Sequence, residues 1–280
     1  MKYSNITTDV ERAFYALTNE TVENCEFSGP ADGESALKEC RDIKVDNCRF
    51  YLRYPMWHLE KGTVNNIFMS DTCRAPLWYD KDITISNSDM HGTKALRECD
   101  RVSIDNSSIE SAEFGWFCRD IDIKNSSLTS EYPFLQTKRM EIDNLSMTGK
   151  YSFQYVEDVV IRNSNFATKD AFWHSKNVTV YDSVIKGEYL GWYAKDLTLI
   201  RCKVIGTQPL CYVENLVMQD CEMIDCDLSF ENSTVDASII GNVTSVKNPA
   251  GGKIVADSYG DVIIDENVFK GSHTDIISRT

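Results

Sequence analysis

The chain has 280 residues, of which 42% are hydrophobic and 26% charged, a composition typical of a folded globular protein. Its formal net charge of −14 repels nucleic-acid phosphates and anionic lipid headgroups, so we expect no nucleic-acid partner and no membrane binding. The N-terminal stretch lacks the apolar core of a secretory signal, and no apolar run is long enough to span a membrane, which predicts a cytoplasmic protein.

Apolar residues recur every 19 positions through most of the chain. The first apolar position of the repeat is occupied by Val102, Ile121, Met140, Val159, Val178, Leu197, Leu216 and Val235. A second follows two residues later, as in Ile104 and Ile123, and such alternation is typical of β-strands. The repeat is too short for two helices and a turn, and a single coil cannot bury its own apolar face. The sequence therefore predicts an all-β, parallel β-helix of about 12 stacked coils.

In chain order, we expect one β-helix domain over residues 1–280. It begins with a partial coil over 1–19, continues with regular coils over 20–234, and ends with irregular coils and a cap over 235–280. The irregular end is expected to block open-ended stacking, so that the protein is a monomer or a small homo-oligomer.

Two of the early coils carry insertions where most coils have four residues. Eight residues, SGPADGES, stand between Phe27 and Ala36, and six, SDTCRA, between Met69 and Pro76. Function tends to reside where a regular scaffold is interrupted. The N-terminal coils are therefore the favoured location of a site.

A polar column follows the two apolar ones. It reads Asn24, Asn47, Asn66, Asn87, Asn106, Asn125, Asn144 and Asn163, then Asp182, Arg201 and Asp220. Asparagine tolerates a left-handed backbone and bonds neighbouring backbone groups, and stacked amides can bond one another. We expect an asparagine ladder inside the coil, at a bend between two strands.

The asparagine ladder and the coil length resemble those of right-handed β-helices of the pectate-lyase type. The segments FSGPADGESALKE, RYPMWH, ALREC, EFGWFC, DAFWHSKNVTV, GEYLGWY and IGTQPLC are similar to a bacterial family of unknown function with that fold. The resemblance covers nearly the whole chain and implies a right-handed parallel β-helix. It implies no activity and no catalytic residues.

Two neighbouring columns after the insertion edge carry aromatic and charged residues. The first reads Lys38, Trp57, Trp78, Arg97, Trp116, Leu135, Gln154, Trp173, Trp192 and Cys211. The second reads Glu39, His58, Tyr79, Glu98, Phe117, Gln136, Tyr155, His174, Tyr193 and Tyr212. An unpaired buried charge costs several kcal/mol, so at least one column should face outward, and Arg97 should stack between Trp78 and Trp116. Aromatic stacks on β-helices can also be simple ladders that cover the coil.

The candidate site gathers residues of both columns and of the adjacent loops. The candidates for binding are Trp57, Trp78, Trp116, Tyr79, Arg53, Tyr54, Arg74 and His91. The candidates for catalysis are Glu98, His58, Arg97, Lys38, Asp32 and Glu34. A weaker second patch would hold Asp170, Trp173, His174, Glu188, Trp192 and Tyr193.

Aromatic faces next to carboxylates and arginine suit sugar rings. Glu98 with Asp32 or Glu34 could provide the two carboxylates of a glycoside hydrolase. His58 or Lys38 with Arg97 could provide the base and the cation of a polysaccharide lyase. Whether the protein is an enzyme is left open, because no motif supports either set.

Two hypotheses follow: a protein that binds or modifies a carbohydrate on the N-terminal edge, or a non-enzymatic scaffold whose aromatic face docks a protein partner. We expect no cofactor and no metal, since the sequence has no phosphate-binding loop and no His/Cys spacing that suits zinc. The ten cysteines are expected to be free thiols packed inward, although several pairs such as Cys202 and Cys221 share a register.

Overall fold

The computed structural model describes residues 1–265, 267 and 273–279. Apart from one short 3₁₀ helix, the regular elements in that part of the chain are β-strands, and they pair in parallel. The chain forms two compact units, residues 1–146 and 147–280, and each is described by itself. The predicted right-handed parallel β-helix is confirmed, with about 14 turns rather than about 12.

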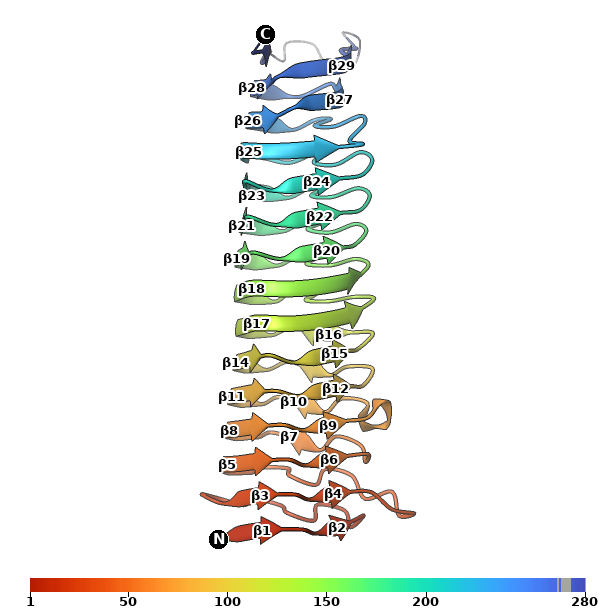
Figure 1. Ribbon diagram of the computed structural model, residues 1–280, viewed down its shortest axis with the longest axis vertical. Helices are drawn as coiled ribbons and strands as arrows, with labels where there is room; N and C mark the ends of the chain where they lie inside the picture. The colour runs from red at the N-terminus through yellow and green to blue at the C-terminus, as the bar shows by residue number, and fades with distance from the viewer. Residues whose placement is uncertain (266, 268–272, 280) are drawn as a thin grey trace. The chain divides into compact units, whose positions relative to one another are not determined.

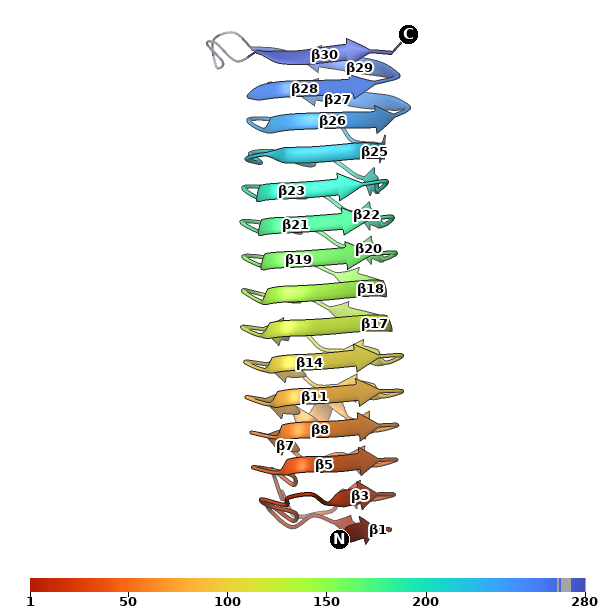
Figure 2. The same cartoon turned by 90° about the vertical axis from the view of Figure 1, so that its left-hand side faces the viewer.

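Each coil of residues 1–146 has two strands separated by a bend and, in the middle coils, a short third strand (Figures 1 and 2). The strands before the bend are β1 (Lys2–Ser4), β3 (Thr21–Glu23), β5 (Arg41–Asp46), β8 (Glu60–Asn65), β11 (Lys81–Ser86) and β14 (Asp100–Asp105). Those after it are β2 (Thr7–Thr8), β4 (Glu26–Phe27), β6 (Arg49–Phe50), β9 (Phe68–Met69), β12 (Asp89–His91) and β15 (Ser108–Glu110). The third strands are β7 (Met56–Trp57), β10 (Leu77–Trp78), β13 (Leu96–Arg97) and β16 (Phe114–Trp116). In β17 (Arg119–Ser130) and β18 (Lys138–Gly149), which ends beyond residue 146, one strand runs through the bend.

Residues 147–280 repeat this plan. The strands before the bend are β19 (Glu157–Arg162), β21 (Lys176–Tyr181) and β23 (Lys195–Ile200), and those after it are β20 (Asn165–Ala167), β22 (Val184–Lys186) and β24 (Lys203–Ile205). The later strands are β25 (Leu216–Ile224), β26 (Thr234–Ile240), β27 (Asn242–Lys247), β28 (Gly251–Ala256), β29 (Ser258–Ile263) and β30 (Thr274–Ser278).

The 19-residue repeat is the register of the sheet. Ile83 and Ile85 of β11 pair with Val102 and Ile104 of β14, and all four side chains are buried while Thr84 between them is exposed. Burial of every second residue is what a strand with one face on the core requires. Each coil thus adds a layer of apolar side chains to the core.

The repeat changes near the C-terminal end. Thr234 pairs with Gly251, 17 residues on, whereas Gly252 pairs with Thr274, 22 residues on. The described residues after 235 nevertheless continue as parallel strands. Part of the predicted cap, residues 266, 268–272 and 280, lies outside the described residues.

The asparagine ladder exists, but it lies on the surface rather than inside the coil. Asn47, Asn66, Asn87 and Asn106 are exposed, with φ between 47° and 51°. Their amides bond across coils, as between Asn106 Nδ2 and Asn87 Oδ1 at 2.7 Å. The expectation of an internal ladder is therefore wrong, because a left-handed residue at the bend directs its side chain outward.

The residue after each asparagine points inward and bonds the backbone instead. Ser88 Oγ donates to the carbonyl of Ser86 at 2.7 Å and accepts the N–H of Ile67 at 3.3 Å. Ser107 repeats both bonds one coil later. A small hydroxyl therefore satisfies the buried backbone of the bend, which asparagine was expected to do.

All ten cysteines are buried free thiols, as predicted. Cys99 illustrates their role: its Sγ donates to the carbonyls of Arg97 and Leu77 at 3.2 and 3.6 Å. Such thiols act as small apolar groups with weak donors.

Asp80 occupies the same position in its coil as Cys99, in a column that continues with Cys118 and Thr137. Its side chain is inaccessible to solvent, and Oδ1 accepts the N–H of Leu59 at 2.7 Å. Burial raises the pKa of this carboxyl well above its ordinary value of 3.8. A protonated Asp80 reproduces the hydroxyl of Thr137, which occupies the same column and accepts the N–H of Cys118 at 3.2 Å.

We predict that Asp80 makes the protein less stable as the pH rises. The raised folded-state pKa means that unfolding releases a proton above about pH 4, so stability falls by up to about 1.4 kcal/mol per pH unit until the folded-state pKa is reached. Asp80→Asn keeps the Leu59 bond and removes this slope. The urea unfolding midpoints of the native chain and the variant should therefore lie closer together at about pH 5 than at about pH 8, where the native midpoint falls below that of the variant.

Asp82→Asn is the matched control, because Asp82 stands two residues after Asp80 and its pKa is lowered by its bond to Arg101. It should shift both midpoints equally. A native chain and an Asp80→Asn variant that differ by the same amount at both pH values would show that Asp80 is ionised in the fold.

Candidate functional site

The columns predicted to carry the site lie on the third strands and on a second bend, which follows those strands and is distinct from the bend that the asparagines occupy. In this section and in the name of the groove, "bend" means this second bend. The side chains of Lys38, Trp57, Trp78, Arg97 and Trp116 are half-buried. The next residue in each coil stands at the bend, and of these Tyr79 and Phe117 are each 40% exposed. The outward orientation inferred from the charged members of the columns is therefore confirmed for the bend column.

The bend residues share a left-handed backbone. Glu39, His58, Tyr79, Glu98 and Phe117 have φ between 53° and 60°, and the N–H of each donates to a carbonyl of the next coil. A left-handed conformation costs an ordinary residue about 1–2 kcal/mol, less for asparagine or glycine. Glycine or asparagine would adopt this backbone at lower cost, yet five successive coils carry a larger side chain here. This suggests that the exposed groups of these side chains have a function.

Two shallow hollows run along this bend. The first, of about 340 Å³, is lined by Glu39, Arg41, His58, Leu59, Glu60, Tyr79, Lys81 and Glu98. The second, of about 580 Å³, is lined by Tyr79, Lys81, Glu98, Cys99, Asp100, Phe117 and Arg119. Because they share three residues, we treat them as one feature, the bend groove.

Bend residues pair across coils within the groove. His58 Nδ1 lies 2.9 Å from Glu39 Oε1, which favours the tautomer with the proton on Nδ1 and leaves Nε2 as an acceptor. Tyr79 bonds Glu98, and the carboxylate raises the pKa of the phenol. The His58 and Tyr79 rings meet edge to face at 5.4 Å.

Arg97 is held from three sides. Its Nε lies 3.2 Å from Glu98, its Nη1 3.5 Å from Glu113, and its guanidinium carbon 5.4 Å from the centre of the Trp116 ring. The predicted cation–π contact with Trp116 is confirmed, but the second ring that the guanidinium meets is Phe117 at 5.3 Å and not Trp78. A substrate carboxylate would have to compete with both glutamates for this guanidinium, which weakens the lyase hypothesis in which Arg97 supplies the cation.

The tryptophans cover one another. Trp57 and Trp78 stack with ring centres 5.6 Å apart and planes inclined by 11°, and Lys38 Nζ lies 4.0 Å from the centre of Trp57. Tyr54 meets both rings, at 6.0 and 6.2 Å. A ligand at this place would meet mainly the edges of these two rings. Their proposed role in binding stays a prediction.

The loop residues form separate groups. Arg53 binds Asp32 with two nitrogens and lies 3.4 Å from Glu34. These carboxylates belong to the coil of Glu39, three coils from Glu98 and so about 14 Å away along the stack. Paired carboxylates of a glycoside hydrolase stand at most about 9.5 Å apart. The geometry does not support Glu98 with Asp32 or Glu34 as such a pair.

Arg74 and His91 lie apart from the bend groove. Arg74 is exposed at the end of the 3₁₀ helix η1 (Asp71–Cys73), which fills the second insertion. His91 lies on β12, where its Nε2 is 3.0 Å from Asp89. The sequence repeat shows which residues are neighbours along the stack, but it does not show which columns share a face of the coil. The prediction that Arg74 and His91 lie beside the residues of the bend groove is therefore wrong.

Sequence reasoning missed the basic side of the groove. Arg41, Lys81 and Arg119 line it, and they alternate from coil to coil with Glu60 and Asp100. The signal was the alternation of sign at 19- to 21-residue spacing. It neutralises the groove by local pairs, as between Arg41 and Glu60 at 3.5 Å.

The described residues contain no group of three or more His, Cys, Asp or Glu side chains suited to a metal ion. No helix within the described part of the chain is long and apolar enough to cross a membrane.

The weaker patch of residues 147–280 is an aromatic strip at the same register. Tyr155, His174, Tyr193 and Tyr212 stack in sequence, with ring centres 4.9, 5.1 and 4.9 Å apart. Tyr155 and Tyr193 are 49% and 47% exposed. Trp173 and Trp192 stack beside them in the neighbouring column, whereas Asp170 is buried and Glu188 pairs with Lys169.

Comparison with known proteins places the chain in a family. Residues 1–277 match the model of a protein family of unknown function (DUF3737), and the chain belongs to that family. No curated protein matches the sequence.

Solved structures are similar to the chain at low sequence identity. The surface adhesin PfbA of Streptococcus pneumoniae is 11% identical, with a TM-score of 0.43 over 85% of this chain and 76% of that one. The tailspike protein of E. coli bacteriophage HK620 is 8% identical, with a TM-score of 0.46 over 92% and 62%. A mannuronan C-5 epimerase module of Azotobacter vinelandii is 10% identical, with a TM-score of 0.32 over 85% and 88%.

We predict that Glu98→Gln lowers the pKa of Tyr79. The glutamine can still accept the phenol proton, but it lacks the negative charge that disfavours the phenolate. Tyrosine ring ¹³C NMR across a pH titration gives the value, and Tyr79→Phe identifies the signal. An unchanged Tyr79 titration in Glu98→Gln would show that the two groups do not interact in solution.

Proposed function

We propose that the bend groove of residues 1–146 binds an oligosaccharide. The observation that carries this proposal is the hollow itself, which passes exposed hydrogen-bonding side chains contributed by successive coils. Carboxylates such as Glu39 and Glu98 accept bonds from sugar hydroxyls, and His58 Nε2 and the Tyr79 hydroxyl extend the set. A shallow, polar, repetitive surface suits a linear ligand that lies along it better than a compact one.

The charge of the groove favours a ligand of low net charge. Arg41 and Lys81 face Glu60 and Asp100 across the strands, so cations and anions alternate along the rim. An acidic sugar chain would gain from the cations and lose about as much at the carboxylates. A neutral oligosaccharide avoids this loss, because its hydroxyls can donate hydrogen bonds to the carboxylates and accept them from the cations.

The proposal is one of binding, with catalysis left as a hypothesis. His58 is the best candidate for a general base, since Glu39 orients its ring and Nε2 can accept a proton. A hydrolytic pair would need a second carboxylate closer to Glu98 than Asp32 or Glu34.

Docking of a protein partner is the second candidate function, and the strip of residues 147–280 favours it. The rings of Tyr155, His174, Tyr193 and Tyr212 lie face to face, so the strip offers their edges and not flat faces on which sugars stack. Exposed tyrosines of limited conformational freedom are typical of protein interfaces.

We predict that His58→Ala and Tyr79→Ala each weaken oligosaccharide binding by about tenfold or more, because each removes a hydrogen-bonding group from the hollow. A glycan array identifies ligands, and isothermal titration calorimetry measures their affinity for each variant. Tyr193→Ala is the matched control: it occupies the same register outside the groove and should bind normally.

Failure of the native chain to bind any glycan would overturn the proposal. Equal losses of oligosaccharide affinity in Tyr79→Ala and Tyr193→Ala would instead indicate that the variants are misfolded or that the oligosaccharide binds the aromatic strip of residues 147–280. A purified protein partner whose affinity falls in Tyr155→Ser/Tyr193→Ser but not in His58→Ala would support the second candidate.

A further inference from the structure

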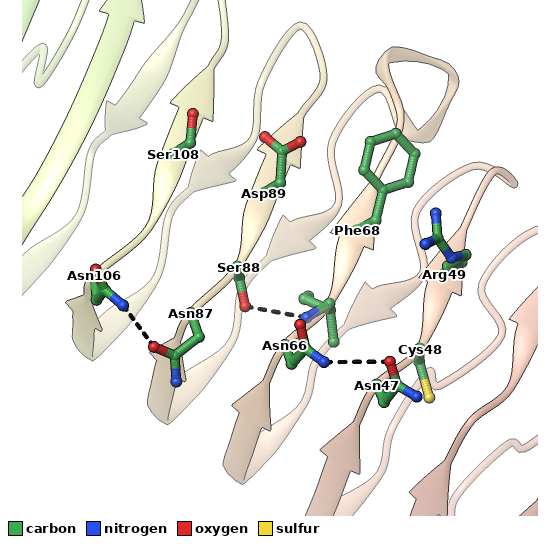
Figure 3. A pocket seen from close by; sticks show the side chains of 11 residues that line it. Asn47, Cys48, Arg49, Asn66, Phe68, Asn87, Ser88, Asp89, Asn106 and Ser108 are labelled. Atoms are coloured by element: carbon green, nitrogen blue, oxygen red, sulfur yellow. Dashed lines mark hydrogen bonds between the residues drawn. The ribbon is translucent and has the colours of Figure 1, made fainter.

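The exposed asparagine ladder lines the floor of another hollow, on a different face of the coils. Its volume is about 530 Å³, and it is lined by Asn47, Cys48, Arg49, Asn66, Ile67, Phe68, Asn87, Ser88, Asp89, Asn106 and Ser108. Figure 3 shows the asparagines of four coils in a row at the ends of the strands before the bend, with Arg49, Phe68 and Asp89 on the strands that follow. We name this hollow the asparagine groove.

The asparagines keep hydrogen-bonding capacity beyond what the ladder uses. A side-chain amide has two N–H donors and an oxygen with two lone pairs. Asn47 donates to Asn24 at 2.6 Å and receives from Asn66 at 3.2 Å, which uses one donor and one lone pair. One donor and one acceptor site per coil remain for another molecule.

The ladder is interrupted in the middle of the groove. Asn87 Nδ2 donates to Asn65 Oδ1 at 2.7 Å instead of to Asn66. Among the described residues, Asn66 Oδ1 therefore receives no side-chain donor, and Figure 3 shows the gap between the bonded pairs Asn47–Asn66 and Asn87–Asn106. Asn106 at the end of the groove is bypassed in the same way, because Asn125 Nδ2 donates to Asp105 Oδ1 at 2.9 Å, so the groove holds two exposed amide acceptors.

An aromatic ring stands beside the interruption, in a column whose neighbouring members are polar. Phe68 pairs in register with Arg49 on one side and Asp89 on the other, and Ser108 follows. The ring is half-buried. Tyr51 and His91 meet it at 50° and 49°, so neither lies flat upon it. The exposed guanidinium of Arg49 lies over one side of the ring, 6.0 Å from its centre, and no aromatic ring among the described residues stacks on it as Trp78 does on Trp57.

We propose that the asparagine groove is a second glycan-binding site, which holds a neutral linear oligosaccharide along the stack of coils. Phe68 supplies the apolar platform for a sugar ring. Asn66 and Asn87 supply an acceptor and a donor for its hydroxyls. The site is separate from the bend groove, and neither proposal depends on the other.

The spacing of the groups selects this ligand over an extended peptide. Coils lie about 4.8 Å apart, whereas like-facing groups of an extended peptide recur about every 6.7 Å. A peptide would therefore fall out of register with the amides after one coil. A pyranose unit carries hydroxyls around its ring, so a linear oligosaccharide can bond the amides of successive coils without the strict alternation of a peptide.

The charges at the rim select a neutral sugar. Arg49 lies 6.0 Å from the centre of the Phe68 ring and Asp89 lies on its other side, where it bonds His91. Opposite charges on either side of the platform give a uronate no net attraction.

The test uses the full-length chain and NMR of its side-chain amides. Cellohexaose, laminarihexaose and maltohexaose are the neutral probes, and a galacturonate hexamer is the acidic comparator. Asn66→Asp and Asn87→Asp assign the two amide signals. At least one neutral hexamer should shift both signals saturably and more strongly than the acidic hexamer does.

Phe68→Ser should weaken this binding by about tenfold or more, and it should fold because serine occupies the same column at Ser108 and Ser127. Ser127→Ala, in that column beyond the groove, and Tyr79→Ala, in the bend groove, should leave it unchanged. Three results overturn the proposal: no shift with any neutral hexamer, normal binding by Phe68→Ser, or shifts that vanish in Tyr79→Ala. Binding at the bend groove alone would leave the proposed function standing and refute only the second site.

Discussion

The backbone hydrogen bonds between successive coils hold most residues directly above the residue that precedes them by 19 positions. The step is 21 to 23 where an early coil carries an insertion and 16 or 17 in β26 to β29. His58 donates its N–H to the carbonyl of Trp78, and Tyr79 donates to that of Arg97, so each column repeats one geometry. A column with a left-handed backbone stays left-handed whatever its residues are. Side chains at the same position of successive coils lie about 4.8 Å apart, so each must pack or bond favourably with the one before and the one after it.

The columns meet this constraint in several ways. The exposed amides bond one another, and the buried hydroxyls and thiols bond carbonyls of the preceding strands. Charges alternate: Arg101 reaches back to Asp82, and Arg139 reaches back to Asp120 at 2.6 and 2.7 Å. Exposed pairs of this kind contribute little stability individually, but they avoid stacking like charges. Within the aromatic columns, most rings of successive coils stack and cover one another's faces.

This self-pairing explains which parts of the site could be read from the sequence. The period revealed the strands and the register, and the charges of the two columns, such as Arg97 and Glu98, indicated that at least one column faces outward because unpaired charges are not buried. It could not show which of two adjacent polar residues turns inward. Asn87 and Ser88 are both polar, and only the left-handed φ of Asn87 directs the amide outward and the hydroxyl inward. Nor could it show where the coil surface is concave, since that depends on bend angles.

Binding capacity arises where a column does not satisfy itself. A complete ladder of amides or charges offers a ligand only what is left after each member has bonded its neighbours. Asn66 and Phe68 break two adjacent columns within one coil, and the second insertion follows at once, lengthening the step from Asn66 to Asn87 to 21 residues. Coil length alone does not cause the break, because Asn47 still bonds Asn24 across a step of 23 residues, whereas Asn125 bypasses Asn106 at the regular step of 19. In both interruptions the amide bonds the residue that precedes the ladder asparagine, Asn65 or Asp105, and the coils keep the acceptor that is left exposed in register with its neighbours.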